Sequence, residues 1–122
     1  MTKILLIEDI PDNAELVRKA LSQSGYEIIH APDAETGLQL ALAHRPDLIL
    51  LDLGLPDYDG QTLASWLRAE ATLVDIPIVA LTAWPEETAK QMVESYGCNG
   101  YICKPITKVN IFVAQVNSYL KA

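Results

Sequence analysis

Residues 47–52, Asp-Leu-Ile-Leu-Leu-Asp, form a short apolar run with a carboxylate at each end. Four consecutive aliphatic residues without polar alternation predict a strand buried on both faces, as in a parallel sheet. The residues that follow include Gly54, Pro56 and Gly60 and predict a loop. Asp52 is therefore expected at the C-terminal end of a buried strand, which is where open α/β sheets bind their ligands.

Other predicted strands also end in polar side chains. Residues 3–7 are followed by Glu8 and Asp9, residues 76–81 by Thr82, and residues 100–103 by Lys104. A further short strand is predicted over residues 26–31. If the strands run parallel and lie side by side, three acids, one hydroxyl and one ammonium meet at one edge of the sheet.

Helical patterns alternate with these strands. The predicted helices cover about residues 12–24, a segment capped by Asp33, a segment after Gly60, a segment from Pro85 to Gly97, and about residues 107–120. The predicted core faces of the first, second and last helices include Leu16, Leu42 and Val109, whereas Ile111 is predicted to point away from the core. Repeated βα units of this kind predict a parallel sheet covered on both sides.

Length and composition predict one domain over residues 1–122, with no output domain. The formal net charge of −7 argues against binding to nucleic acid or to an anionic membrane. No apolar stretch is long enough to span a bilayer, and Met1 is too close to the first strand for a signal peptide. Cys98 and Cys103 are interpreted as free apolar thiols of a cytoplasmic protein without disulfides.

The acids at the predicted edge imply a particular chemistry. Glu8, Asp9 and Asp52 would repel one another, so the cluster must hold protons or bind a cation. Oxygen ligands of this kind suit Mg²⁺ or Mn²⁺. A Mg²⁺ ion bound by carboxylates often bridges to phosphate. Asp52 could then act as a nucleophile toward phosphorus, with Thr82 and Lys104 stabilising the transferred oxygens. Each residue alone is often a cap or a surface group, and only their joint placement makes the prediction specific.

At these residues the chain resembles the receiver domain of two-component response regulators. The motifs are Ile-Glu-Asp at 7–9, Leu-Asp-Leu-Gly-Leu-Pro at 51–56 with Asp-Gly at 59–60, Leu-Thr-Ala at 81–83, and Tyr-Ile-Cys-Lys-Pro at 101–105. The resemblance covers essentially the whole chain. It implies a flavodoxin-like, doubly wound (βα)5 fold with a five-stranded parallel sheet in strand order 2-1-3-4-5.

The resemblance also implies roles at the acidic edge. Asp52 is expected to accept a phosphoryl group from a histidine kinase or a histidine phosphotransfer protein. Glu8 and Asp9 are expected to hold Mg²⁺ together with Asp52 and the backbone carbonyl of Gly54. The family often has Asp at the position of Glu8, and the longer carboxylate is expected to retain metal binding.

Further implied roles concern switching. Thr82 and Lys104 are expected to contact the phosphoryl oxygens, and Thr82 and Tyr101 to move together. The peptide bond before Pro105 is typically cis in this family. The side chains at Gly54 and Trp84 are expected to tune hydrolysis of the phosphorylated state. A downstream protein, or a second copy in a weak homodimer, is expected to contact the face formed by the predicted helix from Pro85 to Gly97, the strand over residues 100–103 and the helix over about residues 107–120. The candidate contacts on this face are Lys90, Glu94, Tyr101 and Ile111.

Several alternatives remain open from the sequence. The chain could be a stand-alone receiver or a receiver excised from a hybrid histidine kinase. A flavodoxin would share the topology, but the acidic residues after the first strand would repel a flavin phosphate. A phosphatase with an aspartyl nucleophile would need a second acid where this chain has Gly54. A receiver that is never phosphorylated is disfavoured, because all the matched site residues are present.

Overall fold

The computed structural model describes residues 2–104 and 106–120, so the peptide bond before Pro105 lies outside the described part. The elements in chain order are β1 (Lys3–Ile7), α1 (Pro11–Ser22), β2 (Glu27–Ala31), α2 (Ala34–His44), β3 (Leu48–Asp52), α3 (Gly60–Ala69), the 3-10 helix η1 (Ala71–Leu73), β4 (Ile78–Thr82), α4 (Glu86–Tyr96), β5 (Gly100–Cys103) and α5 (Val109–Leu120). The five strands are parallel and lie in the order β2-β1-β3-β4-β5. The predicted fold class and strand order are confirmed.

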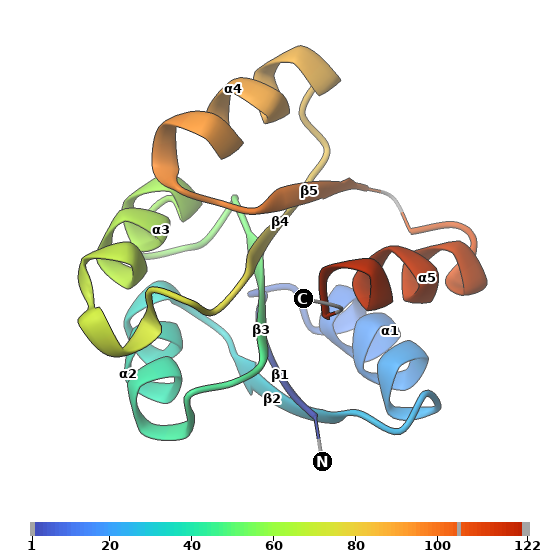
Figure 1. Ribbon diagram of the computed structural model, residues 1–122. Coiled ribbons are helices and arrows are strands. Elements are labelled where there is room, and N and C mark those ends of the chain that lie inside the picture. Colours follow the sequence, from blue (N-terminus) through green and yellow to red (C-terminus); the bar gives the residue numbers. More distant parts are fainter. Residues whose placement is uncertain (1, 105, 121–122) are drawn as a thin grey trace.

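The helices form a layer on each side of the sheet. Figure 1 shows α1 and α5 together on one side, α2 and α3 on the other, and α4 beside the end of the sheet formed by β4 and β5. Each side has its own core. Ile4, Leu6 and Leu50 pack with Val17 of α1 and Phe112 of α5. Leu5, Ile49, Leu51, Leu63 and Leu67 pack on the other side with α2 and α3. Alternate residues of one strand thus face opposite cores, as the pleat of a strand requires.

The register of the sheet brings the polar strand ends to one edge. Ile7 pairs with Leu51, Asp52 pairs with Leu81, and Thr82 pairs with Cys103. Since β1, β3, β4 and β5 are successive neighbours in the sheet, the polar residues that end or directly follow them lie beside one another. Because all the strands are parallel, their C-terminal ends point to the same side of the molecule.

Three predicted core positions are wrong. Leu16 and Leu42 are each 39% exposed, and Val109 is 41% exposed. The helical period of the sequence identifies a broad apolar stripe, but only packing decides which side of that stripe meets the sheet. In α1, Ala14 is buried in place of Leu16, together with the predicted Val17, Ala20 and Leu21. The helix ends two residues before the predicted end. Ile111 is 49% exposed, which confirms that it points away from the core.

The two cysteines differ from each other. Both are free thiols, as predicted, but Cys98 is buried and Cys103 is exposed. Burial raises the pKa of the Cys98 thiol to about 11, so this group is a neutral core residue. The prediction of free thiols is thus confirmed for both cysteines, and only Cys98 belongs to the core.

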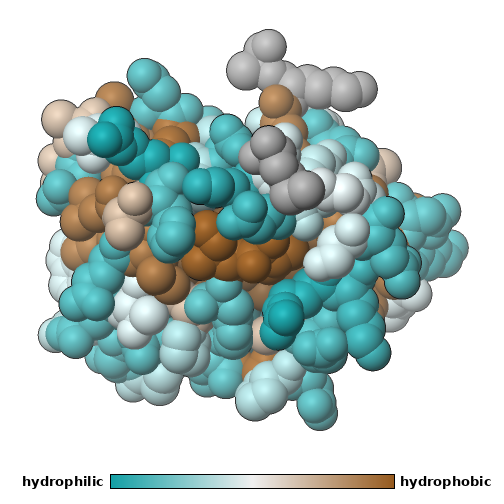
Figure 2. All heavy atoms as spheres, turned by 90° about the horizontal axis from the view of Figure 1, so that it is seen from below, coloured by the Kyte–Doolittle hydropathy of each residue, from teal (hydrophilic) through white to brown (hydrophobic). Residues whose placement is uncertain are grey.

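The face seen from below in Figure 1 is drawn in Figure 2, where a hydrophobic area lies among hydrophilic residues. The edge strand β2 lies on this side of the fold, with Ile28 and Ile29 partly buried.

Within residues 2–104 and 106–120, no helix combines the length and the hydrophobicity that crossing a bilayer would require.

Candidate functional site

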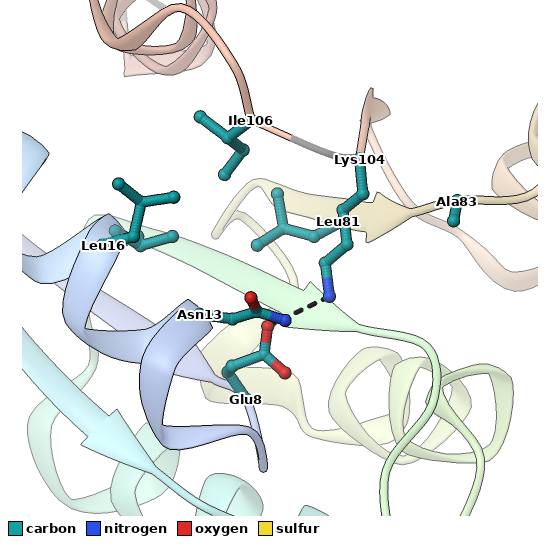
Figure 3. Close-up of a pocket in the computed structure, with 8 residues that line it drawn as sticks. Glu8, Asn13, Leu16, Leu81, Ala83, Lys104 and Ile106 are labelled. Carbon is teal, nitrogen blue, oxygen red and sulfur yellow. Dashed lines mark hydrogen bonds and ion pairs between the residues drawn. The ribbon is translucent and has the colours of Figure 1, made fainter.

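Four polar side chains meet at the C-terminal edge of the sheet. Glu8 follows β1, Asp52 ends β3, Thr82 ends β4 and Lys104 follows β5. The Lys104 ammonium donates to Glu8 Oε1 at 3.0 Å and to Asp52 Oδ1 at 3.0 Å. Figure 3 shows the Lys104 side chain reaching down toward Glu8 from the end of β5. The predicted convergence of these residues on one edge is thus present in the structure.

The acids of this edge are removed from water. Glu8 is fully buried and Asp52 is 6% exposed. Burial and the neighbouring Asp52 carboxylate raise the pKa of Glu8 to about 7, against the opposing effect of Lys104. Burial also opposes ionisation of Asp52, but hydrogen bonds from Glu8 and Lys104 outweigh it and lower the pKa of Asp52. In the metal-free protein, Asp52 is therefore the charged carboxylate, and Glu8 exchanges its proton near neutral pH.

The donor set fits a small divalent cation. Glu8, Asp9 and Asp52 each offer one carboxylate oxygen, and these oxygens lie within 4.8 Å of one another. Asp9 Oδ1 is buried without a hydrogen-bond partner within the described part of the chain. A buried, unpaired carboxylate oxygen is costly unless a proton or a cation compensates it. Three hard oxygen ligands around that position suit Mg²⁺.

Thr82 and Tyr101 are in contact with α4 and the segment that leads into it. Thr82 is buried, and its Oγ1 accepts a hydrogen bond from the Trp84 backbone N–H at 2.9 Å. The Tyr101 hydroxyl donates to Glu86 Oε1 at 3.0 Å, at the start of α4. Lys90 Nζ lies 3.7 Å from the same Glu86 oxygen. The sequence does not single out Glu86 as the partner of Tyr101, because an exposed glutamate in a first helical turn is an ordinary feature.

A pocket of about 330 Å³ lies against this edge. It is lined by polar Glu8, Asn13 and Lys104 and by apolar residues that include Leu16, Leu81 and Ile106. Asn13 was not predicted to take part in the site, and no local pattern distinguishes it from other residues of α1. The exposure of Leu16, which the helical period placed in the core, is explained by its position on the wall of this pocket.

The comparisons with known proteins agree with this arrangement. Residues 4–115 match the family described as response regulator receiver domain. The chain belongs to this family. Receiver domains are signalling switches of two-component systems that bind Mg²⁺ at an acidic site and interact with histidine kinases or phosphotransfer proteins. Membership in this family sets aside the flavodoxin and phosphatase alternatives.

Three similar proteins match this chain along nearly its whole length. The chain is 38% identical over 117 residues to the polar-differentiation response regulator DivK of Brucella anthropi, covering 96% of this chain and 94% of DivK. A putative response regulator from Chloroflexus aurantiacus superposes with a TM-score of 0.92 at 30% identity, covering 99% and 98% of the two chains. The receiver domain of a Pseudomonas aeruginosa sensor histidine kinase, with magnesium coordinated in its active-site cleft, has a TM-score of 0.90 at 29% identity, covering 99% and 98%.

The raised pKa of Glu8 predicts that metal binding depends on pH. A cation binds the ionised carboxylate, and the pKa of about 7 means that Glu8 loses its proton as the pH rises through neutrality. We expect the affinity for Mg²⁺ to rise between about pH 6 and about pH 8, by up to about tenfold per pH unit at the acidic end. Titrations of Mg²⁺ at several pH values, followed by tryptophan fluorescence, measure this dependence.

Two variants serve as controls for the titration. Glu8→Gln cannot ionise, so its weaker Mg²⁺ binding should be nearly independent of pH over the same range. Asp9→Ala combined with Asp52→Asn removes two of the three clustered carboxylates and should abolish the fluorescence response. A response that is unchanged in the double variant would show that Mg²⁺ binds elsewhere.

Proposed function

We propose that this receiver accepts a phosphoryl group on Asp52 from a histidine kinase or a histidine phosphotransfer protein. The observation that carries the proposal is the contact of Lys104 with both Asp52 and Glu8 at 3.0 Å, beside the unpaired Asp9 oxygen. Incubation with Mg²⁺ and acetyl phosphate, followed by intact-mass analysis, tests it. Incorporation of one phosphoryl group is the expected result, and no incorporation from acetyl phosphate or phosphoramidate would contradict the proposal.

The chemistry follows from the charge states of the site. The lowered pKa of Asp52 keeps its carboxylate ionised, so one of its oxygens can attack phosphorus. A new oxygen–phosphorus bond forms while the bond from phosphorus to the donor imidazole nitrogen breaks, and that nitrogen keeps the electron pair. Lys104 would hold the transferred oxygens by charge-assisted hydrogen bonds, with the Thr82 hydroxyl as a second donor. Mg²⁺ held by Glu8, Asp9 and Asp52 would neutralise part of the phosphoryl charge.

The proposed switch begins at Thr82. Turning its hydroxyl toward a phosphoryl oxygen on Asp52 would give up the hydrogen bond that Thr82 accepts from Trp84. The segment into α4 would then shift, and Tyr101 would leave Glu86. These contacts support a route from phosphorylation to the face formed by α4, β5 and α5.

We place the contact with a downstream protein, or with a second copy in a weak homodimer, on that face. Lys90 and Glu94 are exposed on α4, one turn apart. Ile111 is exposed on α5, and Tyr101 is half-buried on β5 between the two helices. The face thus combines one apolar contact with charged residues, which is typical of a weak, reversible interface.

Ile111→Asp is expected to weaken association at this face and to leave folding nearly unchanged. Ile111 is 49% exposed, so the charge adds little cost in the monomer but is costly when an apolar partner surface covers it. Sedimentation of the phosphorylated protein measures self-association, and urea unfolding measures stability, with a change within about 0.5 kcal/mol expected.

The matched control for that experiment is Asn110→Asp, which adds the same charge at the neighbouring exposed position of α5. Equal weakening by both variants would show that charge alone is responsible. A large loss of stability in Ile111→Asp would contradict the exposed position of the side chain.

The lifetime of the phosphorylated state is expected to depend on Gly54 and Trp84. A Cβ atom added at Gly54 would meet nothing within 4 Å, so the first atom of a new side chain fits there without repacking. Trp84 is partly buried against the core, and we expect its bulky side chain to shield the acyl phosphate from water. We expect Gly54→Asn combined with Trp84→Glu to hydrolyse the acyl phosphate faster, because both positions then carry groups that can orient water.

Phosphate release after removal of the donor, at constant Mg²⁺, measures this rate. Each single variant is measured beside the double variant, so that the two positions can be separated. Equal or slower release from the double variant would reject the shielding role of Trp84.

We infer that the receiver acts without a covalently attached output domain, in the cytoplasm. The match to DivK over 94% of that protein supports the first point. The two free thiols support the second, because disulfides are rare in the cytoplasm. A receiver belonging to a hybrid kinase is the second candidate, favoured by the similarity to the Pseudomonas aeruginosa kinase receiver. Immunoblotting of native cells for the size of the protein separates the two.

A further inference from the structure

The loop between β3 and α3, residues 53–59, carries Gly54 beside Asp52. Backbone hydrogen bonding from Gly54 is among the causes that lower the pKa of Asp52. The far end of the loop is fixed at the start of α3, where Asp59 Oδ1 accepts from Thr62 N–H at 2.8 Å. The Gly60 N–H donates to Leu53 O at 3.2 Å. The two ends of the loop are thus joined to each other.

The middle of the loop is joined to another part of the fold by Asp57. Its Oδ1 accepts from Ala34 N–H at 2.9 Å, and its Oδ2 accepts from Glu35 N–H at 3.1 Å. Ala34 and Glu35 are the first two residues of α2, and their N–H groups have no partner within the helix. A carboxylate near such groups is favoured both by the hydrogen bonds and by the helix dipole.

The first turn of α2 therefore receives two carboxylates of different origin. Asp33 belongs to the same segment and caps the helix locally, accepting from Thr36 N–H at 2.8 Å. Asp57 comes from a loop 23 residues from Ala34 along the chain. Asp33 already supplies an ordinary helix cap, so the bonds of Asp57 do something that the local cap does not. They fix the loop that leaves Asp52 onto a helix that packs against the sheet.

We propose that Asp57 is a positioning residue for the phosphoacceptor site, which holds the loop so that Gly54 stays in place beside Asp52. The proposal rests on the proposed function of Asp52. Asp57 itself is exposed and touches neither the clustered carboxylates nor Lys104 among the contacts of the described residues. It acts through the backbone of residues 53–56. If Asp57 only capped α2, its loss would lower the stability of that helix and leave the phosphoacceptor site unchanged.

The comparison of Asp57→Ala with Asp33→Ala separates these two roles. Each variant removes side-chain hydrogen bonds to the first turn of the same helix, so both should lose comparable stability in urea unfolding. Only Asp57→Ala should weaken Mg²⁺ binding, by about tenfold, as is usual when an outer partner of a metal site is lost. It should also slow phosphorylation by acetyl phosphate at saturating Mg²⁺. Asp57→Asn keeps one oxygen acceptor and should fall between Asp57→Ala and the unsubstituted protein.

A second readout does not depend on metal or phosphoryl transfer. The amide resonance of Gly54 in the metal-free protein should shift in Asp57→Ala and stay in place in Asp33→Ala. The proposal is overturned if Asp57→Ala leaves both the Gly54 resonance and the Mg²⁺ affinity unchanged, or if Asp33→Ala changes them equally. If instead the proposed function is wrong, the unsubstituted protein takes up no phosphoryl group. The Gly54 resonance would still shift in Asp57→Ala, so the two failures can be told apart.

Discussion

Asp52→Asn is expected to abolish incorporation of a phosphoryl group from acetyl phosphate. The side chains have nearly the same shape, but the amide has no anionic oxygen to attack phosphorus. The substitution should not unfold the protein, because the amide fills nearly the same space as the buried carboxylate and its oxygen can still accept the hydrogen bond from Lys104. Intact mass after incubation with Mg²⁺ and acetyl phosphate measures incorporation, with none expected in the variant.

The control for this experiment is Asp47→Asn, the same change just before the other end of β3. Asp47 is exposed, and its carboxylate accepts a hydrogen bond from Lys3 N–H, which an amide oxygen can also accept. This variant should be phosphorylated like the unsubstituted protein. Full incorporation in Asp52→Asn would show that another residue accepts the phosphoryl group.

Lys104→Ala is expected to slow phosphorylation by about a hundredfold or more, the usual effect of losing one group that stabilises developing charge. The Lys104 side chain is 18% exposed, and its ammonium lies 3.0 Å from Asp52 and from Glu8, where a transferred phosphoryl group would meet it. Burial alone would lower the pKa of Lys104, but its hydrogen bonds to the two carboxylates raise it. The group therefore stays charged throughout the pH range in which the protein would work.

Mg²⁺ binding should respond to this variant in the opposite direction. The ammonium competes with a cation for the oxygens of Asp52 and Glu8, so Lys104→Ala should bind Mg²⁺ at least as tightly as before. Rates are measured at saturating Mg²⁺ to separate chemistry from binding. Lys108→Ala, at an exposed lysine nearby in sequence, is the control and should change neither quantity. Normal phosphorylation of Lys104→Ala would show that Lys104 does not stabilise the phosphoryl group during transfer.

Much of the candidate site follows from local sequence patterns. A strand is recognised by its own apolar run, and the residue that ends it is recognised with it, so Asp52 and Thr82 could be placed at strand ends without a structure. Parallel pairing then brings them to one edge as a geometrical consequence. The contact of Lys104 with both carboxylates agrees with this placement, although its distances needed the tertiary structure.

The contacts of Tyr101 and Asp57 were not predictable in the same way. Tyr101 binds Glu86, 15 residues away, and Asp57 binds α2 from a loop 22 and 23 residues away. Neither partner is distinguished by its sequence neighbours, because exposed acids in loops and first helical turns are common. Their meeting depends on how the helices are oriented after they pack.

The sequence by itself determined the order of elements, the parallel sheet and the set of polar residues at its edge, because these depend on short-range periodicity and on strand direction. The tertiary structure alone decided which side of each apolar stripe is buried, so that Leu16, Leu42 and Val109 are exposed. It also decided the ionisation of Glu8, whose pKa of about 7 depends on burial beside Asp52. Packing brings together residues far apart in the chain, and burial in a medium of low dielectric then sets the strength of their interactions.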